Sequence, residues 1–311
     1  MSNNTERCAL NKIRFLTAGE SHGPALSCII EGLPAGLPLK ESDIERDMKR
    51  RQKGYGRGGR MQIEKDKATI LSGVRYGKTL GSPLSLVLYN KDWPNWTQKM
   101  SIEPVKGEAD KLQMPRPGHA DYSGMLKYRH DDLRNILERS SARETAMRVA
   151  AGAAAKQLLA QFDINIYSHV TRIGPAVADV SLVDGTLQPG SDAWEIFFKT
   201  VESSDVSCAD DSAANVMRAA IDKAKEKGYS LGGIIECAAG GVPVGLGSHV
   251  HWDRKLDARL AYAMMSINAI KMVEIGMGER VSEIPGSEVH DELFYQEETG
   301  YIRSHNHAGG I

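Results

Sequence analysis

Apolar positions along the 311-residue chain follow two spacings, which predict a mixture of strands and helices. Short apolar runs bounded by glycine, proline or polar residues predict strands at 13–17, 26–33, 61–64, 84–89 and 164–173. Apolar residues that recur every three or four positions predict helices at 41–52, 141–162, 211–228 and from 253 onward. A stretch dense in glycine and valine, 231–247, predicts a hairpin.

Helix starts are predicted from capping residues. Ser42 with Glu45, and Ser141 with Glu144, have the S-x-x-E spacing in which a hydroxyl and a carboxylate satisfy the free amides of a first turn. Asp211 is expected to cap the helix that ends near residue 228.

The segment 115–152 carries most of the candidate chemistry. Two prolines and Gly118 exclude regular structure from 115–121, so a stiff loop is expected to present Arg116, His119 and Asp121. We expect Arg139, Ser140 and Ser141 to lie at a helix N-terminus, where free amides attract anions. An ordinary capped core helix is the alternative for any single residue. Six arginines favour a phosphate or carboxylate site instead: Arg116, Arg129, Arg134, Arg139, Arg143 and Arg148.

Two further segments are candidates for the same site. A glycine-flanked turn between the first two predicted strands holds Ser21 and His22, although a surface histidine at a hairpin tip is the alternative. The loop 49–60 is rich in glycine and in cations, and we expect it to bring Arg51, Arg57 and Arg60 to a small polyanion.

Nucleotide-binding motifs are excluded by context. The glycines of 54–59 follow a predicted helix and precede a predicted strand, which is the reverse of a dinucleotide fingerprint. The G-K-T at 77–79 has no glycine five positions before Gly77 and no helix after it. An RNA-binding module that uses 55–60 remains an alternative, as does a phosphate-binding enzyme of the kinase-like transferase kind.

Composition narrows the class of protein. With 41% hydrophobic and 25% charged residues, the chain is globular and long enough for one large or two ordinary domains. A net charge of −1 predicts no nucleic-acid or membrane partner. Four scattered cysteines and a polar N-terminus predict a cytoplasmic protein with reduced thiols.

Two tryptophans and two His-x-His pairs are further candidates for site residues. Trp93 and Trp96 are expected to be packing aromatics. We expect no metal, because no third ligand is spaced with the pairs His249-x-His251 and His305-x-His307.

Six segments together resemble the chorismate synthase family over essentially the whole chain. They are 19–24 (GESHGP), 50–57 (RRQKGYGR), 116–121 (RPGHAD), 138–145 (ERSSARET), 253–260 (DRKLDARL) and 267–269 (INA). The resemblance implies one α+β domain, a β-α-β layered sandwich with central helices between antiparallel sheets, assembling as a homotetramer. It also implies the last step of the shikimate pathway, in which 5-enolpyruvylshikimate 3-phosphate loses phosphate to give chorismate.

The same resemblance implies a site that uses reduced FMN without net redox change, with NADPH as a candidate reductant. Its substrate-binding residues are Arg51, Arg57 and Arg116, and its flavin-binding residues are Arg139, Ser140, Ser141, Asn268 and Ala269. Ser21, His22 and His119 are the implied catalytic residues. His22 is expected to protonate the leaving phosphate, and His119 to protonate or stabilise the reduced flavin. The family continues past a glycine-rich motif at 309–310, so we expect the 311-residue chain alone to bind reduced FMN poorly and to be inactive.

Overall fold

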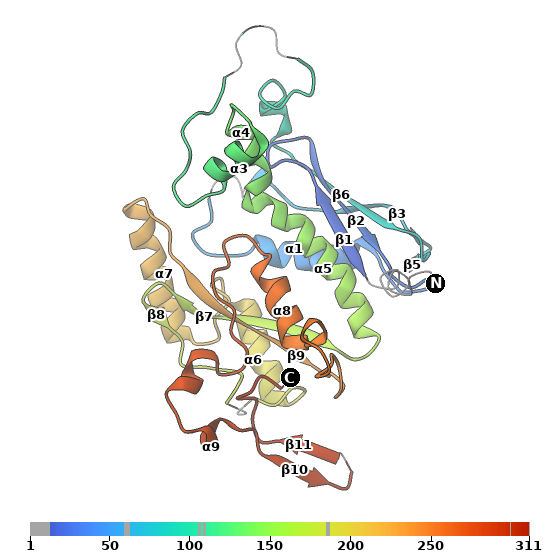
Figure 1. Cartoon of the computed structure of the whole chain (residues 1–311), viewed down its shortest axis with the longest axis vertical. Coiled ribbons are helices and arrows are strands. Elements are labelled where there is room, and N and C mark those ends of the chain that lie inside the picture. The colour runs from blue at the N-terminus through green and yellow to red at the C-terminus, as the bar shows by residue number, and fades with distance from the viewer. Residues whose placement is uncertain are drawn as a thin grey trace. The chain divides into compact units, whose positions relative to one another are not determined.

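The computed structural model describes residues 13–58, 63–104, 107, 110–184, 187–298 and 300–310. The chain forms two compact units, coloured by residue number in Figure 1. The first comprises Met1–Lys53 with Arg57–Gln161, and the second comprises Gly54–Gly56 with Phe162–Ile311.

The first unit is built on an antiparallel sheet with the strand order β1-β2-β6-β3. Its strands are β1 (Arg14–Ala18), β2 (Ala25–Glu31), β3 (Thr69–Ser72) and β6 (Leu84–Tyr89). A separate small ribbon pairs β4 (Val74–Arg75) with β5 (Lys78–Thr79). Alternate residues of β2 and β6 are buried on one face, as expected of strands that cover a core on one side.

Two helices cover that face, α1 (Glu41–Gln52) and α5 (Thr145–Ala160), and Figure 1 shows α5 running along the sheet. The buried side of α5 is mostly alanine, which allows its backbone to approach α1 and β2 closely. Met48 of α1 and Met147 of α5 fill the same buried cluster. The predicted helix at 41–52 is therefore confirmed, but its N-cap is Lys40 and not Ser42, because the Asp43 carboxylate accepts the Lys40 amide at 2.9 Å.

The region before α5 differs from the prediction. Two further helices, α3 (Asp121–Tyr128) and α4 (Arg134–Ser140), precede an extended residue, Ser141, with φ −65° and ψ 145°. Ser141 caps a 3-10 turn, Ala142–Glu144, and α5 begins only at Thr145. Arg139 and Ser140 consequently end a helix, and the expectation that they lie at a helix N-terminus is wrong.

The second unit contains a three-stranded antiparallel sheet, in the order β8-β7-β9. Its strands are β7 (Asn165–Ile173), β8 (Ala176–Val177) and β9 (Gly233–Gly240). The predicted hairpin at 231–247 is wrong, because β9 pairs with β7 along its whole length. Two capped helices pack on β7, α6 (Asp192–Ser203) and α7 (Asp211–Glu226), and the α7 cap is Asp210, one residue before the predicted cap.

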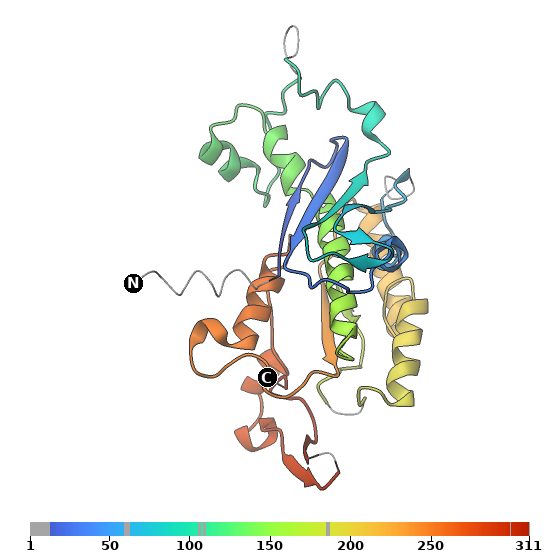
Figure 2. The same ribbon diagram turned by 90° about the vertical axis from the view of Figure 1, so that its right-hand side faces the viewer.

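The rest of the second unit is less regular (Figure 2). It contains α8 (Leu256–Met265), a 3-10 turn (Gly278–Ser282), α9 (Gly286–Val289) and the ribbon of β10 (Leu293–Gln296) with β11 (Gly300–Arg303). The helix predicted from residue 253 onward has apolar residues spaced as if to face a core. In α8, however, none of the described residues is buried.

Three remaining expectations concern single segments. Of the strand predicted at 61–64, the first two residues lie outside the described part, and Ile63 and Glu64 are not in a strand. Cys28, Cys208 and Cys237 form no disulfide, and Cys8 lies outside the described residues. Across the described ranges, no helix is both long and apolar enough to span a membrane.

Candidate active site

The turn between β1 and β2 holds Ser21 and His22 in a fixed position. Gly19 has a φ of 104°, and a Cβ built there would lie 2.5 Å from the Ala25 carbonyl oxygen, so only glycine fits. The Asn90 side-chain amide donates to the Ser21 carbonyl at 3.2 Å and to the Gly23 carbonyl at 2.8 Å. These bonds make the turn a rigid platform.

His22 is bound to a buried carboxylate from α4. Both Glu138 carboxylate oxygens lie 2.9 Å from His22 Nδ1, and one of them also accepts the His22 backbone amide at 2.7 Å. The Glu138 side chain is only 1% exposed, and the Glu138 carbonyl accepts the Ser21 amide. Glu138 therefore positions both the backbone and the imidazole of His22.

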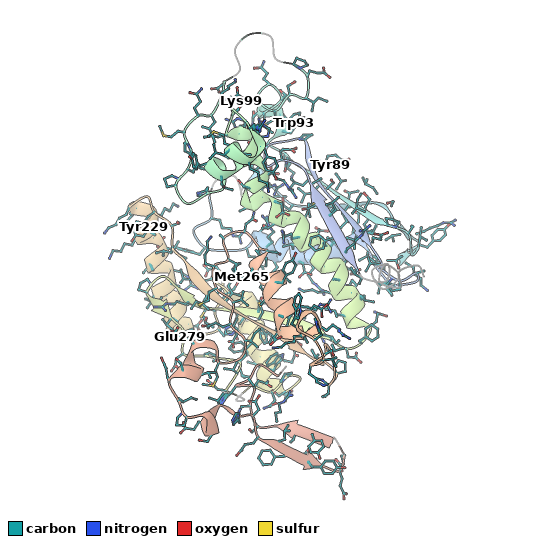
Figure 3. The ribbon with its side chains drawn as sticks, viewed as in Figure 1. Tyr89, Trp93, Lys99, Tyr229, Met265 and Glu279 are labelled. Atoms are coloured by element: carbon teal, nitrogen blue, oxygen red, sulfur yellow. The ribbon has the colours of Figure 1, made fainter. Side chains whose placement is uncertain are left out.

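An aromatic ring packs on the other side of this histidine. The connection after β6, where Trp93 and Lys99 are labelled in Figure 3, also carries Trp96. The Trp96 ring stacks on the His22 ring with 3.8 Å between centroids. Arg134 lies over the same indole, 5.4 Å from its centroid, and 3.5 Å from the Glu138 carboxylate.

Sequence reasoning missed both neighbours of His22. The sequence predicts no separate role for Glu138, which only begins the segment 138–145, and it predicts that Trp96 is a packing aromatic. Glu138 could have been found in the sequence as an acid within an arginine-rich segment, because a buried carboxylate needs a cationic or hydrogen-bonding partner.

A chain of buried polar contacts connects this turn to Arg51. The Asn90 side-chain oxygen accepts two bonds from the Arg143 guanidinium, at 3.1 and 2.8 Å. Arg143 then donates to one oxygen of Asp66 at 2.6 Å, and Arg51 donates to the other at 3.0 Å. Asp66 is 4% exposed and Arg143 is 7% exposed, so the two are buried ions that stabilise each other. The structure thus brings Arg51, Ser21 and His22 into one network.

Positive charge accumulates at the Arg51 end of the network. Burial is the main cause that lowers the pKa of Arg51, Asp66 opposes it, and the cations Arg143 and Arg57 lower the pKa further. Arg57 is exposed and has no ion-pair partner among the described residues, whereas Arg60 lies outside them. An anion brought to Arg51 and Arg57 would relieve this repulsion.

Arg116 and His119 lie on a loop that leads into α3. The Arg116 guanidinium grips Asp121 through two bonds of 2.8 Å, and Asp121 also accepts the Arg116 backbone amide at 2.9 Å. These bonds lower the pKa of Asp121 to about 2. His119 is exposed, and its Nδ1 contacts the Pro117 carbonyl at 2.9 Å. Among the described residues, no hydrogen bond joins this loop to His22.

The predicted flavin residues are divided between the units. In the first unit, Arg139 binds the Thr17 carbonyl at 2.8 Å and the Gly19 carbonyl at 3.3 Å, and the Ser141 hydroxyl donates to the Ser21 hydroxyl at 3.1 Å. Ser140 ends α4 beside them. In the second unit, Asn268 precedes Ala269, whose φ is 70°.

Tyr55, the first residue of the alternative RNA-binding segment 55–60, makes its contacts within the second unit. The Tyr55 hydroxyl donates to the Asp222 carboxylate at 2.9 Å, and its amide donates to the Asp205 carbonyl at 2.9 Å. Two acids beside the ring would repel phosphate, which argues against nucleic-acid binding.

Fold and site together define an α+β protein in which two arginines and a carboxylate-bound histidine belong to one hydrogen-bonded network. A family model described as chorismate synthase matches residues 13–311. The chain belongs to the chorismate synthase family, and its α+β class is confirmed.

Individual relatives agree with this assignment. Chorismate synthase of Enterococcus faecalis is 54% identical over 302 residues, covering 96% of this chain and 76% of the relative. That of Syntrophotalea carbinolica is 55% identical over 305 residues, covering 97% and 76%. A crystal structure of chorismate synthase superposes with a TM-score of 0.80 at 43% identity, covering 97% of this chain and 81% of the other. These relatives favour neither an RNA-binding module nor a flavin-independent enzyme.

Proposed function

We propose that the chain is a lyase that converts 5-enolpyruvylshikimate 3-phosphate into chorismate and phosphate. The reaction is an anti-1,4-elimination, the last step of the shikimate pathway, and it uses reduced FMN without net redox change. The observation that carries the proposal is His22, held by buried Glu138 within a network that ends at Arg51.

The substrate carries two carboxylates and a phosphate, so its recognition needs several cations in a protein of nearly neutral charge. Arg51 and Arg57 are the candidates on α1 and the loop after it, and Arg116 is the candidate on the loop before α3. Asp66 orients the Arg51 guanidinium and Asp121 orients that of Arg116, and neither carboxylate binds all the N–H groups of its arginine. The site is therefore prepared for an anion before substrate arrives.

His22 is the general acid of the proposed elimination. Its Nδ1 faces the Glu138 carboxylate, which leaves Nε2 to donate a proton to the departing phosphate oxygen. Glu138 stabilises the imidazolium before the transfer, and the Ser21–Ser141 hydroxyl pair lies on the same turn. Ser21 would orient the phosphate beside His22.

When bound, reduced FMN would lend electron density to the substrate ring as phosphate leaves and would regain it as the ring loses its hydrogen, so no net redox change occurs. Ser140, Ser141 and Arg139 are the residues of the first unit that would hold it, and Asn268 and Ala269 are those of the second. The left-handed φ of Ala269 supports a ligand-binding role, because strained non-glycine backbone gathers at functional sites. Exposed His119 would protonate or stabilise the bound flavin.

We also infer a homotetramer in the cytoplasm, with NADPH as a candidate flavin reductant. Family resemblance supports these points. Net charge of −1 supports a protein without nucleic-acid or membrane partners.

Titration with FMN and substrate tests the proposal. We would compare the 311-residue chain with an extended chain, in which residues of the Enterococcus faecalis relative bring it to that relative's length. The extended chain should perturb the reduced FMN spectrum only when substrate is present. Binding of RNA, or substrate turnover that is independent of flavin, would contradict the proposal.

The two histidines have separate predicted effects. In the extended chain, His22→Ala and His119→Ala should each lower kcat roughly 10²- to 10⁴-fold, the span of a general acid–base contribution, while circular dichroism stays unchanged. Near-normal turnover of either variant would remove that histidine from the mechanism.

A further inference from the structure

A second group of titratable side chains lies in the second unit and includes none of the residues assigned above. Asp291, His305 and His307 each offer a ligand atom, and the three atoms lie within 4.8 Å of one another. All three residues are partly buried. The third ligand that the spacing of His305-x-His307 could not supply therefore comes from Asp291, which precedes β10.

His307 is held in the form that binds metal. Its Nδ1 lies 3.0 Å from the Glu288 carbonyl, and a carbonyl can only accept, so Nδ1 carries the proton. Nε2 is then left with its lone pair, as in metal sites where the second imidazole nitrogen donates to a backbone carbonyl. The Asp184 carboxylate lies 3.9 Å from this Nε2, beside the group of three but not part of it.

Asp291 and His305 are oriented by the same segment. One Asp291 oxygen lies 2.7 Å from His305 Nδ1 and accepts the His307 amide at 2.7 Å, while the other accepts the Ala308 amide at 3.3 Å. The His305 and His307 rings stack with 3.6 Å between centroids and 16° between planes. Two imidazoles and a carboxylate are thus fixed before any ion binds.

Charge at the cluster also favours a cation. Asp184 and Asp291 contribute two negative charges, and the imidazoles are neutral when they act as ligands. Arg280, which follows the labelled Glu279 (Figure 3), lies 3.5 Å from Asp184 and offsets one of these charges. The other negative charge would attract a divalent ion.

We propose that Asp291, His305 and His307 bind one divalent transition metal of the zinc type. Imidazole nitrogens with carboxylate oxygens form the donor set that zinc accepts, whereas magnesium and calcium prefer oxygen alone. The bound ion would join the segment before β10 to the segment after β11. Its expected role is to hold residues 304–308 in place.

The chain contains its own matched control. His249-x-His251 has the same spacing in the same unit, but both histidines are exposed, and His251 pairs only with exposed Asp253, at 2.9 Å. In the described part of the chain, no other group of three histidine, cysteine, aspartate or glutamate side chains meets the geometry of a metal site.

Isothermal titration of metal-stripped protein with ZnCl2 tests the proposal, using protein without a polyhistidine tag. One zinc per chain is expected. The variants His305→Gln, His307→Gln and Asp291→Asn should each weaken zinc binding at least tenfold, because loss of a group that merely orients a ligand already costs roughly 10- to 100-fold. His251→Gln should bind zinc as the parent does. Circular dichroism of each variant reports whether it folds.

Cobalt substitution gives a test that needs no variant. The parent protein with one equivalent of Co²⁺ should show d–d absorption and no thiolate charge-transfer band, since the ligands are nitrogen and oxygen. A thiolate band would overturn the proposal. In the zinc titrations, two results would also overturn it: a parent affinity no higher than that of the double variant His305→Gln/His307→Gln, or loss of zinc binding in His251→Gln.

Discussion

Replacement of Glu138 by glutamine should slow turnover while leaving substrate affinity nearly unchanged. Glu138 is 1% exposed and contacts the His22 ring at 2.9 Å and the His22 amide at 2.7 Å. Glutamine keeps the size of the side chain but removes the charge that faces the imidazole. A hydrogen bond to a charged group contributes about 1.5–3 kcal/mol. If that stabilisation is lost in the transition state, kcat falls about 10- to 150-fold.

The assay is steady-state chorismate formation by the extended chain under anaerobic conditions with reduced FMN. Because Glu138 acts through His22, the loss should appear in kcat and not in KM, and Glu138→Asp should restore part of it. The second unit provides a control, since Glu236 binds the buried His169 at 2.8 Å. Glu236→Gln should therefore destabilise the fold without changing kcat.

Two results would refute this reasoning. Unchanged kcat in Glu138→Gln would mean that the carboxylate only supports the fold. Equal losses in Glu138→Gln and Glu236→Gln would mean that any broken histidine–glutamate pair reduces activity through stability.

Three further predictions concern the first unit and the thiols. Arg51→Ala should weaken substrate binding by about 2–5 kcal/mol in calorimetry, because it removes one partner of a desolvated charge pair, and unchanged affinity would exclude Arg51 from the site. The pKa of Asp121 is lowered from 3.8 to about 2 by Arg116, so the stability this carboxylate contributes is complete above pH 3.8 and lost as the pH falls through about 2. Arg116→Met should abolish about 2 kcal/mol of that pH-dependent stability in urea titrations, and an unaltered pH profile would contradict the assignment. Burial raises the pKa of Cys28 to about 11, so iodoacetamide at pH 8 should modify exposed Cys237 and spare Cys28 until the chain unfolds, as mass spectrometry would show.

Periodicity predicted the regular elements well where local signals act alone. The helix at 41–52 and the strand at 84–89 have the bounds that were expected, because apolar spacing and turn residues agree there. Caps were less predictable: Ser42 and Asp211 both have capping chemistry, but the residue that actually precedes the first turn is set by where the chain enters the helix.

The pattern of apolar residues does not predict which strands pair when they are far apart in the sequence. The 231–247 stretch was predicted to be a hairpin because it is dense in glycine and valine, yet β9 pairs with β7, which lies some sixty residues earlier. The short helices α3 and α4 carry too few apolar repeats to be recognised, and Glu138 of α4 contacts His22, which only the folded chain brings to it.

The site was predicted as a set of residues and not as an arrangement. Arg51 and His22 are predicted from their glycine-rich surroundings, and Arg143 is predicted as one of six clustered arginines. The structure connects the three through Asp66 and Asn90, which no local pattern marks. The roles of all the candidate catalytic, substrate-binding and flavin-binding residues remain predictions.

The most direct test of the proposed function measures chorismate, phosphate and flavin absorbance together in one anaerobic reaction of the extended chain. We expect one phosphate for each chorismate, no turnover without reduced FMN, and a flavin spectrum that returns to the reduced form when substrate is exhausted. Phosphate release without chorismate, or the same rate in the absence of flavin, would contradict the assignment of this site to the chorismate synthase reaction.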